Sequence, residues 1–344
     1  MAATGFRVVV IHPDNDIPEE DGVTFIGLSL SGSRFVRFAV GGYRAFRAAK
    51  RADAVVFHFH DPDLILWGML WRMCGGIAVY DAHEDVPKAV LRKGWIPRPA
   101  KRLVAAAVAG VEFLAAKTLN AIVAATEPIA ARLSGANTIV VRNYADNIDE
   151  FTRVRRPFAE RENLVMYAGT LGADRGLHRM IDAIQLVDRS LGARLVIAGN
   201  LRGARLVDSA GQEPPPSLVT FLGHVSLERV VEIAGEARVG LQVLEPLVAY
   251  RESLPIKIFE YMAAGIPCVV SDFPGWRSIV ERHGCGVTVN PLSPTEIAAA
   301  ISDLLRDQAR AEQMGQSGRA AVTVHYQWAT EASRLAELYH RLLS

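Results

Sequence analysis

The chain has 344 residues, of which half are hydrophobic and 22% are charged, a composition that is ordinary for a soluble α/β protein of two domains. Lysine and arginine total 38 against 37 for aspartate and glutamate, so the net charge gives no general attraction to nucleic acid and we expect no nucleic-acid partner. The longest apolar stretches fall short of the ~20 residues that span a bilayer, and no signal-peptide pattern opens the sequence, which predicts a cytoplasmic protein.

Short β-branched runs alternate with helical patterns along the chain, which is typical of parallel sheets with helices on both faces. In the first half, the sequence predicts strands over residues 7–12, 23–28, 54–60, 77–81, 121–125 and 138–142. In the second half, it predicts strands over residues 164–168, 194–198, 219–223, 239–244, 268–271 and 286–289. Helices fit between them, for example over residues 176–189, 227–236 and 294–305.

This alternation predicts an α/β fold with two doubly wound, Rossmann-like domains, residues 1–145 and 146–325. The charged, irregular stretch 143–161 is the best candidate for the linker between them. Residues 326–344 form a separate C-terminal segment, with an aromatic start and apolar residues at helical spacing.

Imidazoles and carboxylates follow two strands of the first domain. His60 comes at the end of one strand, and His83 and Asp85 follow the next. Such groups suit hydroxyl binding and proton handling, although a structural role is as good an explanation for His60 and Asp85. Asp61-Pro-Asp63 has the Asp-x-Asp spacing of some metal sites, but its position at a helix start favours a cap. We therefore predict no metal and no required cofactor.

The stretch Lys88–Arg102 carries six basic residues and no acid, with Trp95 and Ile96 among them. A basic, aromatic-bearing stretch of this kind can rest on an anionic membrane surface, where each cation contributes ~1 kcal/mol. A solvated loop and helix start explains the same pattern equally well.

In the second domain, the loop after the strand 164–168 contains Gly169 and Arg175. Glycine lets the backbone approach a phosphate, and arginine can bind the phosphate with two hydrogen bonds. Another strand ends at Gly223 and is followed by His224 and Val225, with Ser226 in position to cap the next helix. Ligands of open α/β sheets bind beyond the carboxyl ends of the strands, where both loops lie.

The run Glu252-Ser-Leu-Pro-Ile-Lys257-Ile-Phe-Glu260 is the most informative segment. A proline that can open a helix precedes Lys257, so free backbone N–H groups and a full positive charge are predicted side by side, a combination suited to a diphosphate. Glu260 lies about one turn further on and can accept hydrogen bonds from sugar hydroxyls. Glu252 adds a second carboxylate eight positions earlier, ahead of the helix.

This run resembles the Glu-x7-Glu segment of retaining nucleotide-sugar glycosyltransferases of the family-4 type. The resemblance implies the GT-B fold, in which two Rossmann-like domains face each other across a cleft. It further implies that Glu260 holds the ribose of the donor nucleotide, that Lys257 contacts its diphosphate and that Glu252 faces the donor sugar. Arg175 matches the second basic residue of the family's phosphate loop, whereas Thr170 stands where the first is usual.

Other segments resemble the same family. In it, backbone groups at the positions of His224 and Val225 meet the nucleobase, and the histidine at the position of His83 lies over the donor sugar near the reacting carbon. The resemblance also implies that the C-terminal helix crosses back to the first domain. His60 and Asp85 become candidates for the acceptor side.

The resemblance fails at the start of the chain. The strand 7–12 resembles the second strand of the family, which implies that the first strand and helix are missing. The acidic connection before residue 23 is predicted to be too short for a parallel crossover. We expect either a longer reading frame or a partner, including a second copy of this chain, that covers the exposed surface.

Together these features predict a retaining glycosyltransferase, of hexosyltransferase type, that works in polysaccharide or glycoconjugate synthesis. Its acceptor would be a lipid-linked molecule or a glycan, and the protein would associate with the inner membrane surface if the basic stretch binds there. The alternatives are a nucleotide-sugar-binding subunit without catalysis and, less favoured, a nucleotide-sugar epimerase of the same fold. The sequence does not specify the base, the sugar, the acceptor or the linkage.

Overall fold

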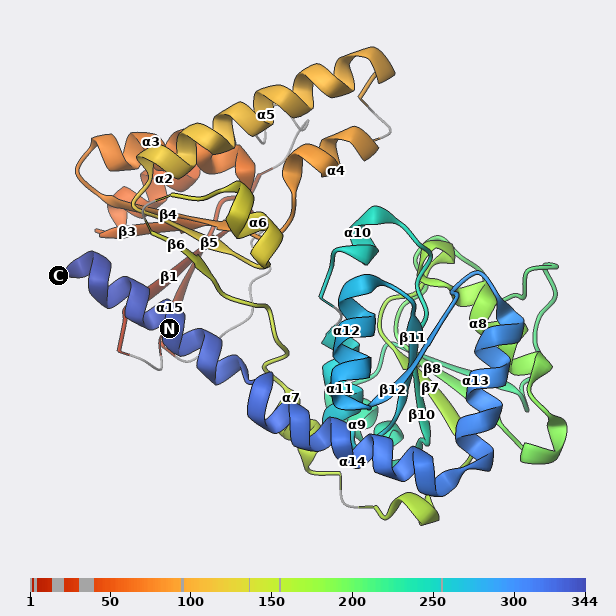
Figure 1. Cartoon of the computed structure of the whole chain (residues 1–344). Coiled ribbons are helices and arrows are strands. Elements are labelled where there is room, and N and C mark those ends of the chain that lie inside the picture. The colour runs from red at the N-terminus through yellow and green to blue at the C-terminus, as the bar shows by residue number, and fades with distance from the viewer. Residues whose placement is uncertain are drawn as a thin grey trace. The chain divides into compact units, whose positions relative to one another are not determined.

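The structure is a computed structural model that describes residues 2, 5–13, 22–30, 40–93, 96–135, 137–154, 156–254 and 256–344. The chain forms two compact units (Figure 1). Unit 1 contains residues 1–142 together with residues 329–344, and unit 2 contains residues 143–328.

Unit 1 is built on a parallel sheet with the strand order β3-β4-β5-β6 and on a separate parallel pair, β1 and β2. Its strands are β1 (Val8–His12), β2 (Val23–Gly27), β3 (Val56–Phe59), β4 (Ile77–Ala82), β5 (Ala121–Ala124) and β6 (Thr138–Val140). Its helices are α2 (Gly42–Arg51), η3 (Pro62–Leu64), α3 (Ile65–Met73), α4 (Val86–Arg92), α5 (Arg98–Thr118), α6 (Glu127–Arg132) and most of α15 (Trp328–Leu343).

The pairing of β1 with β2 corrects one prediction. The sequence pattern suggests that their connection is too short for a parallel crossover, yet Val8 lies opposite Val23 in parallel register. A five-residue strand spans only about 17 Å, and residues 13–22 reach about 33 Å when extended, so the chain can return without a helix. Residues 14–21 of the connection lie outside the described part of the chain.

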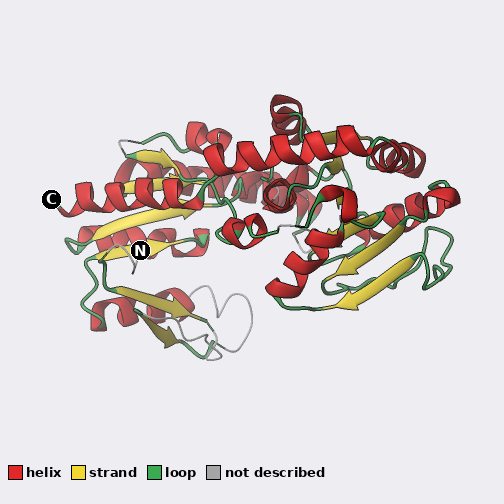
Figure 2. Ribbon diagram, turned by 90° about the horizontal axis from the view of Figure 1, so that it is seen from below, coloured by secondary structure: helices red, strands yellow, loops and turns green. Residues whose placement is uncertain are grey.

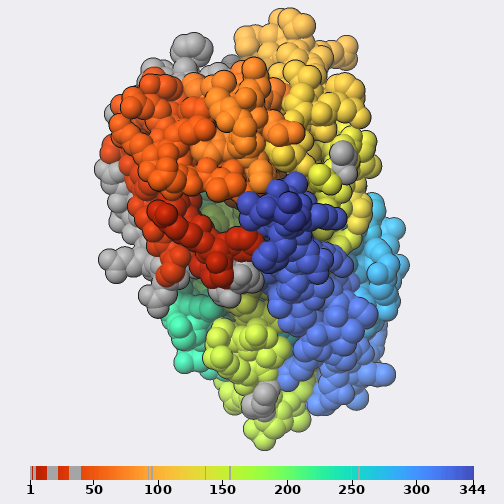
Figure 3. Space-filling view, turned by 90° about the vertical axis from the view of Figure 1, so that its left-hand side faces the viewer, coloured from red at the N-terminus to blue at the C-terminus, as the bar shows by residue number. Residues whose placement is uncertain are grey.

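Helix α15 belongs to unit 1 from residue 329 onward and packs on the residues of its first part. The ring of Tyr339 lies 5.7 Å from that of Phe6, and Glu331 Oε2 accepts a hydrogen bond of 2.9 Å from the backbone N–H of Arg142. Figure 3 shows these C-terminal residues, in dark blue, beside the first strands of the chain, in red. Residues 329–344 are therefore part of the same unit as residues 1–142.

Unit 2 contains a six-stranded parallel sheet with the order β12-β11-β10-β7-β8-β9, and helices flank its strands (Figure 2). Its strands are β7 (Leu164–Ala168), β8 (Arg194–Ala198), β9 (Val219–Gly223), β10 (Val239–Gln242), β11 (Cys268–Ser271) and β12 (Gly286–Val289). Its helices are α7 (Ile148–Thr152), η4 (Phe158–Glu160), η5 (Ala173–Arg175), α8 (Leu177–Leu186), η6 (Arg189–Leu191), α9 (Leu227–Glu236), α10 (Val248–Arg251), α11 (Ile256–Ala264), α12 (Pro274–His283), α13 (Pro294–Arg306) and α14 (Gln308–His325).

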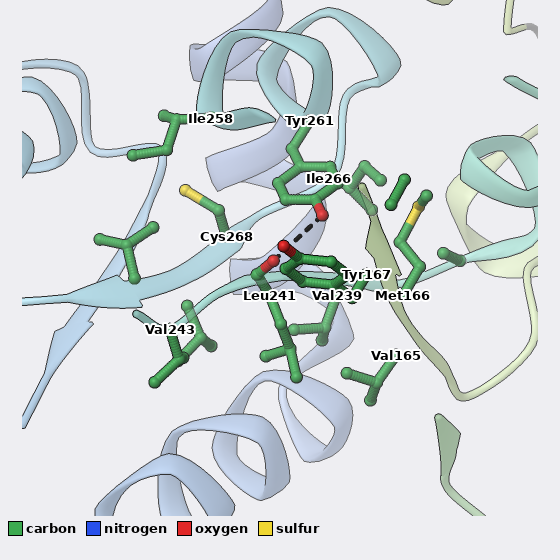
Figure 4. Packing of buried hydrophobic residues seen from close by; sticks show 14 of the residues in the cluster. Val165, Met166, Tyr167, Val239, Leu241, Val243, Ile258, Tyr261, Ile266 and Cys268 are labelled. Carbon is green, nitrogen blue, oxygen red and sulfur yellow. Dashed lines mark hydrogen bonds between the residues drawn. The ribbon is translucent and has the colours of Figure 1, made fainter. Parts of the chain in front are cut away.

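The core of unit 2 explains why its strands are recognisable in the sequence. Both faces of the sheet are covered, so the strands are continuous apolar runs, and all five residues of β7 are buried. Figure 4 shows Tyr261 of α11 against this sheet, where its hydroxyl donates a 3.0 Å hydrogen bond to the carbonyl of Leu241. Gly240 makes room for that ring, because a Cβ there would lie 2.5 Å from it. Helix α11 is thereby fixed on the sheet.

The stretch 143–161 is not simply a linker. Its apolar side chains join the core of unit 2, and Ile148 and Phe151 of the short helix α7 are buried. The spacing of Tyr144, Ile148 and Phe151 is helical, a signal that the surrounding charges hide. In the described part of the chain, no helix combines the length and apolar character needed to cross a bilayer.

Candidate functional site

Helix α11 carries an ion pair at the centre of the candidate site. Lys257 Nζ lies 3.1 Å from Oε1 and 2.9 Å from Oε2 of Glu260, one turn further along. The Glu260 side chain is only 3% exposed, whereas that of Lys257 is 29% exposed. The buried carboxylate therefore has a cation as its partner, and the lysine still reaches solvent. Pro255, the predicted helix opener, lies outside the described residues.

A pocket of about 390 Å³ opens beside this pair, within unit 2. It is lined by Asn143, Tyr144, Ala145, Asp146, Asn147, Ile256, Lys257, Glu260 and Trp328. Asn147 Nδ2 lies 3.5 Å from Glu260 Oε1, and the buried Oδ1 of Asn147 has no hydrogen-bond partner among the described residues. Buried polar atoms are usually paired, so this oxygen is suited to a hydrogen-bond donor of a bound ligand. The volume fits a small molecule.

The loop after β7 lies against the lysine. A Cβ at Gly169, where φ is +144°, would lie 3.4 Å from Lys257 Cε and 3.5 Å from the Tyr167 hydroxyl. The backbone of Gly169 also approaches Gly199 so closely that a Cβ on Gly199 would lie 1.9 Å from the Gly169 carbonyl oxygen. The two glycines thus hold the loop beside Lys257.

Arg175 stands at the end of η5 in the same loop. Its guanidinium lies 5.9 Å from the centre of the Tyr250 ring, and the Tyr250 hydroxyl donates a 2.5 Å hydrogen bond to Asp174. Gly176 follows with φ +74°, and a Cβ there would lie 2.0 Å from the Val243 carbonyl oxygen. The chain can enter α8 at this point only with glycine.

The remaining predicted residues of unit 2 lie at its surface or packed on its core. Glu252 is exposed at the C-terminal end of α10, and the adjacent Ser253 carbonyl accepts a 2.8 Å hydrogen bond from Trp276 Nε1. His224 is exposed, whereas Val225 packs on the core. Of the predicted donor residues, the structure brings Gly169, Lys257 and Glu260 together.

In unit 1, three histidines surround Asp81. His58 Nε2 and His60 Nδ1 lie 3.2 and 3.4 Å from Asp81 Oδ2, and His83 Nε2 lies 3.5 Å from Oδ1. His60 Nδ1 and His83 Nε2 are 2.8 Å apart, and the Tyr339 hydroxyl lies 2.5 Å from His58 Nδ1. Strands β3 and β4 are parallel neighbours, so their ends deliver these groups to one place.

The electrostatics of this cluster differ from residue to residue. Burial would raise the pKa of Asp81, but hydrogen bonds from His58 and His60 and the charge of the imidazoles hold it well below its usual range. The hydrogen bond to Asp81 raises the pKa of His60 against the effect of burial. Burial lowers the pKa of His83, although the charge of Asp81 opposes this. His83 is thus more readily neutral than His60, because the pKa of His83 is lowered and that of His60 is raised.

Asp85 has structural partners. Its carboxylate accepts from the backbone N–H of Lys88 at 3.3 Å and caps α4, and it lies 3.2 Å from Lys88 Nζ and 3.6 Å from Arg132 Nε. Arg132 also binds the fully buried Glu112 at 2.7 Å. Asp61 occupies the N-cap position of η3, as predicted, but its side chain makes no capping hydrogen bond.

The family model for Glycosyl transferases group 1 matches residues 148–321, half of the chain and nearly all of unit 2. This chain belongs to the group 1 glycosyl transferases. The matched segment includes Gly169, Lys257 and Glu260 and all the strands of the unit 2 sheet.

Curated relatives of this group 1 chain include the glycogen synthase of Mycobacterium tuberculosis, which is 28% identical over 206 residues, or 59% of this chain and 48% of that protein. The alpha-D-kanosaminyltransferase of Streptomyces kanamyceticus is 26% identical over 184 residues, or 52% of this chain and 46% of that protein. The chain spans about half the length of the curated relatives it matches.

Solved structures show that the group 1 chain has the GT-B fold. The sucrose-phosphate synthase of Thermosynechococcus elongatus superposes with a TM-score of 0.70 at 19% identity, covering 99% of this chain and 90% of that one. Anabaena Alr3699/HepE, solved in complex with UDP-glucose, superposes with a TM-score of 0.65 at 16% identity, covering 93% and 86%. The predicted fold class is confirmed.

Several site residues of the group 1 chain were not among the sequence candidates. Asn147 lies in the stretch predicted as a linker, and Tyr339 lies 281 positions from its partner His58. Asp81 could have been found from the sequence. It lies two positions before His83, and in extended chain such side chains point to the same face.

Proposed function

We propose that this chain is a retaining glycosyltransferase that moves a hexosyl group from a nucleoside diphosphate sugar to a lipid-linked or glycan acceptor in the cytoplasm. The observation that carries the proposal is the buried Glu260 carboxylate paired with Lys257 beside a pocket of small-molecule size. A carboxylate, an amide oxygen and a lysine together suit ribose hydroxyls and a diphosphate.

In this proposal, Lys257, Arg175 and the loop at Gly169 stabilise the charge that develops on the departing diphosphate. Glu260 binds the ribose, His224 and Val225 border the base, and Glu252 and His83 act at the donor sugar. His60 and Asp85 face the acceptor. The acceptor hydroxyl attacks from the face that the diphosphate leaves and gives its proton to the departing diphosphate oxygen. The sugar keeps its anomeric configuration, and no enzyme nucleophile is required.

Donor chemistry is supported by relatives rather than by contacts. Anabaena Alr3699/HepE has been solved with UDP and with UDP-glucose. A GDP-mannose-dependent alpha-(1-6)-phosphatidylinositol monomannoside mannosyltransferase of Mycobacterium tuberculosis is 36% identical over 86 residues, a quarter of this chain. UDP- and GDP-sugars are therefore the first donors to test.

We also propose that unit 1 rests on an anionic membrane through α4 and α5. Arg98, Lys101 and Arg102 begin α5, and apolar side chains of the same helix are exposed, with Leu103 at 75% and Phe113 at 62%. Cations beside exposed apolar groups are the composition of an interfacial helix. Lys88 is partly engaged by Asp85, at 3.2 Å, and Trp95 lies outside the described residues.

The test is a panel of nucleoside diphosphate sugars offered to the full chain, with binding followed by calorimetry and diphosphate release followed by a coupled assay. We expect one donor to bind and to be slowly hydrolysed to a sugar with unchanged anomeric configuration, as read by NMR. An inverted product would contradict the retaining mechanism. Binding without turnover, with acceptor mixtures present, would favour a nucleotide-sugar-binding subunit, and an epimerised sugar would favour an epimerase. No binding of any donor would overturn the proposal.

A further inference from the structure

The cluster at the ends of β3 and β4 has the composition of a metal site. His58 lies on β3 with His60 directly after its end, and Asp81 lies on β4 with His83 directly after its end, so the ends of two neighbouring parallel strands bring the four side chains together. One atom each of His58, His60 and Asp81 can be chosen so that all three lie within 4.8 Å of one another. Two imidazoles and a carboxylate are ligands typical of zinc-class ions.

The distances agree with metal coordination. Bonds of 2.0–2.1 Å at tetrahedral angles place neighbouring ligand atoms about 3.3 Å apart. His58 Nε2 lies 3.2 Å from Asp81 Oδ2, and His60 Nδ1 lies 3.4 Å from the same oxygen. The geometry points to a site for a zinc-class divalent transition-metal ion, held by His58 Nε2, His60 Nδ1 and Asp81 Oδ2.

The surroundings of the ligands fit this assignment. A metal-binding histidine usually has its other ring nitrogen hydrogen-bonded, which fixes the ring and the tautomer. Tyr339 provides this contact, since its hydroxyl lies 2.5 Å from His58 Nδ1. The side chain of Asp81 is 11% exposed and that of His58 17%, whereas that of His60 is 59% exposed. The first two ligands are held within the fold, and the third gives the ion a path of entry.

Hydrogen bonds alone satisfy the cluster less well. The single hydrogen that His60 Nδ1 can carry faces both Asp81 Oδ2, at 3.4 Å, and His83 Nε2, at 2.8 Å. A cation at the centre attracts the nitrogen lone pairs and the carboxylate at once. His83 Nε2, close to both His60 and Asp81, stands where a fourth ligand or a bound water would be.

An ion at this point would join β3, β4 and, through Tyr339, helix α15. It would stabilise unit 1, because it binds the folded chain and not the unfolded one. Metal binding itself involves no donor and no phosphate, although His60 and His83 are also the residues proposed for the acceptor and the donor sugar. The proposal departs from the sequence-based prediction of no metal, which considered only the Asp-x-Asp spacing of Asp61 and Asp63.

The test uses the full chain without a polyhistidine tag, freed of metal by a chelator, with no nucleotide present. Zn²⁺ binding is measured by calorimetry, and Co²⁺ is added as a spectroscopic probe whose visible absorption reports nitrogen and oxygen ligands. We expect one Zn²⁺ per chain, a higher Tm with Zn²⁺ and no competition from Mg²⁺, which prefers oxygen ligands.

His58→Gln and Asp81→Asn should each weaken Zn²⁺ binding by at least a hundredfold and remove the gain in Tm. Tyr339→Phe keeps all three ligands and should weaken binding by ten- to a hundredfold. The matched control is His340→Gln, because this exposed histidine is next to Tyr339 on the same helix. Circular dichroism verifies that each variant is folded. The proposal is overturned if the wild-type chain shows no saturable Zn²⁺ binding, or if Tyr339→Phe and His58→Gln bind Zn²⁺ as the control does.

Discussion

Replacing Lys257 with alanine tests the donor site most directly. The lysine neutralises the buried Glu260, with its Nζ 3.1 and 2.9 Å from the two carboxylate oxygens. When a diphosphate binds, the same ammonium must turn toward it, and ribose hydroxyls must then satisfy Glu260. Lysine has three N–H donors, so part of its contact with Glu260 can persist.

The magnitude follows from these contacts. A charge-assisted hydrogen bond contributes about 1.5–3 kcal/mol. Part of this gain is offset because the lysine gives up contact with Glu260 when it turns to the diphosphate. We therefore expect Lys257→Ala to weaken nucleoside diphosphate binding by about ten- to a hundredfold. Among the described residues, the same substitution leaves the carboxylate with one hydrogen bond, from the amide of Asn147 at 3.5 Å. This should lower the free energy of unfolding by about 1–3 kcal/mol, which leaves a typical domain folded.

The assay is calorimetry with the tightest-binding diphosphate among UDP, GDP and ADP, with inorganic pyrophosphate in parallel and urea unfolding of each variant. Lys257→Ala should weaken both ligands, whereas Glu260→Gln should weaken only the nucleotide, because pyrophosphate has no ribose. Arg310→Ala, which removes an exposed cation from the same unit, is the control. Affinities within twofold of the wild-type chain for Lys257→Ala would refute the reasoning.

Three further predictions use other parts of the chain. Glu252→Gln should weaken the intact nucleotide sugar more than the free diphosphate, and calorimetry showing equal losses for the two ligands would contradict its place at the sugar. Gly199→Ala should lower the free energy of unfolding by about 3 kcal/mol or more, because φ is +146° and its Cβ would meet the Gly169 carbonyl at 1.9 Å. Gly192→Ala, with open space around a φ of +58°, should cost only about 1–2 kcal/mol in the same urea titration. Charge reversal at the start of α5, at Arg98, Lys101 and Arg102, should abolish salt-sensitive sedimentation with anionic liposomes. Charge reversal at the exposed Arg205 in unit 2 should not. If the wild-type chain does not sediment with such liposomes, the explanation as a solvated helix stands.

Most strands could be predicted because their pattern is local. The apolar runs of a doubly covered sheet are readable from the sequence, and every observed strand begins and ends within two residues of its predicted bounds. The parallel pairing of β1 and β2 could not be predicted, because the sequence between them has no helical periodicity that would indicate a crossover. The core role of Phe151 was hidden by the charges on either side of it, Asp149, Glu150 and Arg153.

The site was predictable only in part, because only the local part of its pattern is visible in the sequence. The proximity of Lys257 and Glu260 follows from helical spacing, and the glycine at 169 follows from its place at a strand end. The contact of Glu260 with Asn147 spans 113 positions, and that of His58 with Tyr339 spans 281. Such contacts depend on how whole elements pack, and neither residue type nor spacing in one segment can reveal them.

Each unit holds a buried carboxylate that faces cationic or nitrogen groups, and the nature of those groups separates the two sites. The partner of Glu260 is a lysine on a flexible stem, 29% exposed, which can leave the carboxylate for a phosphate when hydroxyls take its place. The partners of Asp81 are rigid rings, of which His58 is fixed by β3 on one side and by Tyr339 on the other. A flexible partner such as Lys257 can move from the carboxylate to a bound phosphate, as the proposed donor site requires. A fixed imidazole such as that of His58 favours a ligand that enters between the ring and the carboxylate, and a metal ion is small enough to do so.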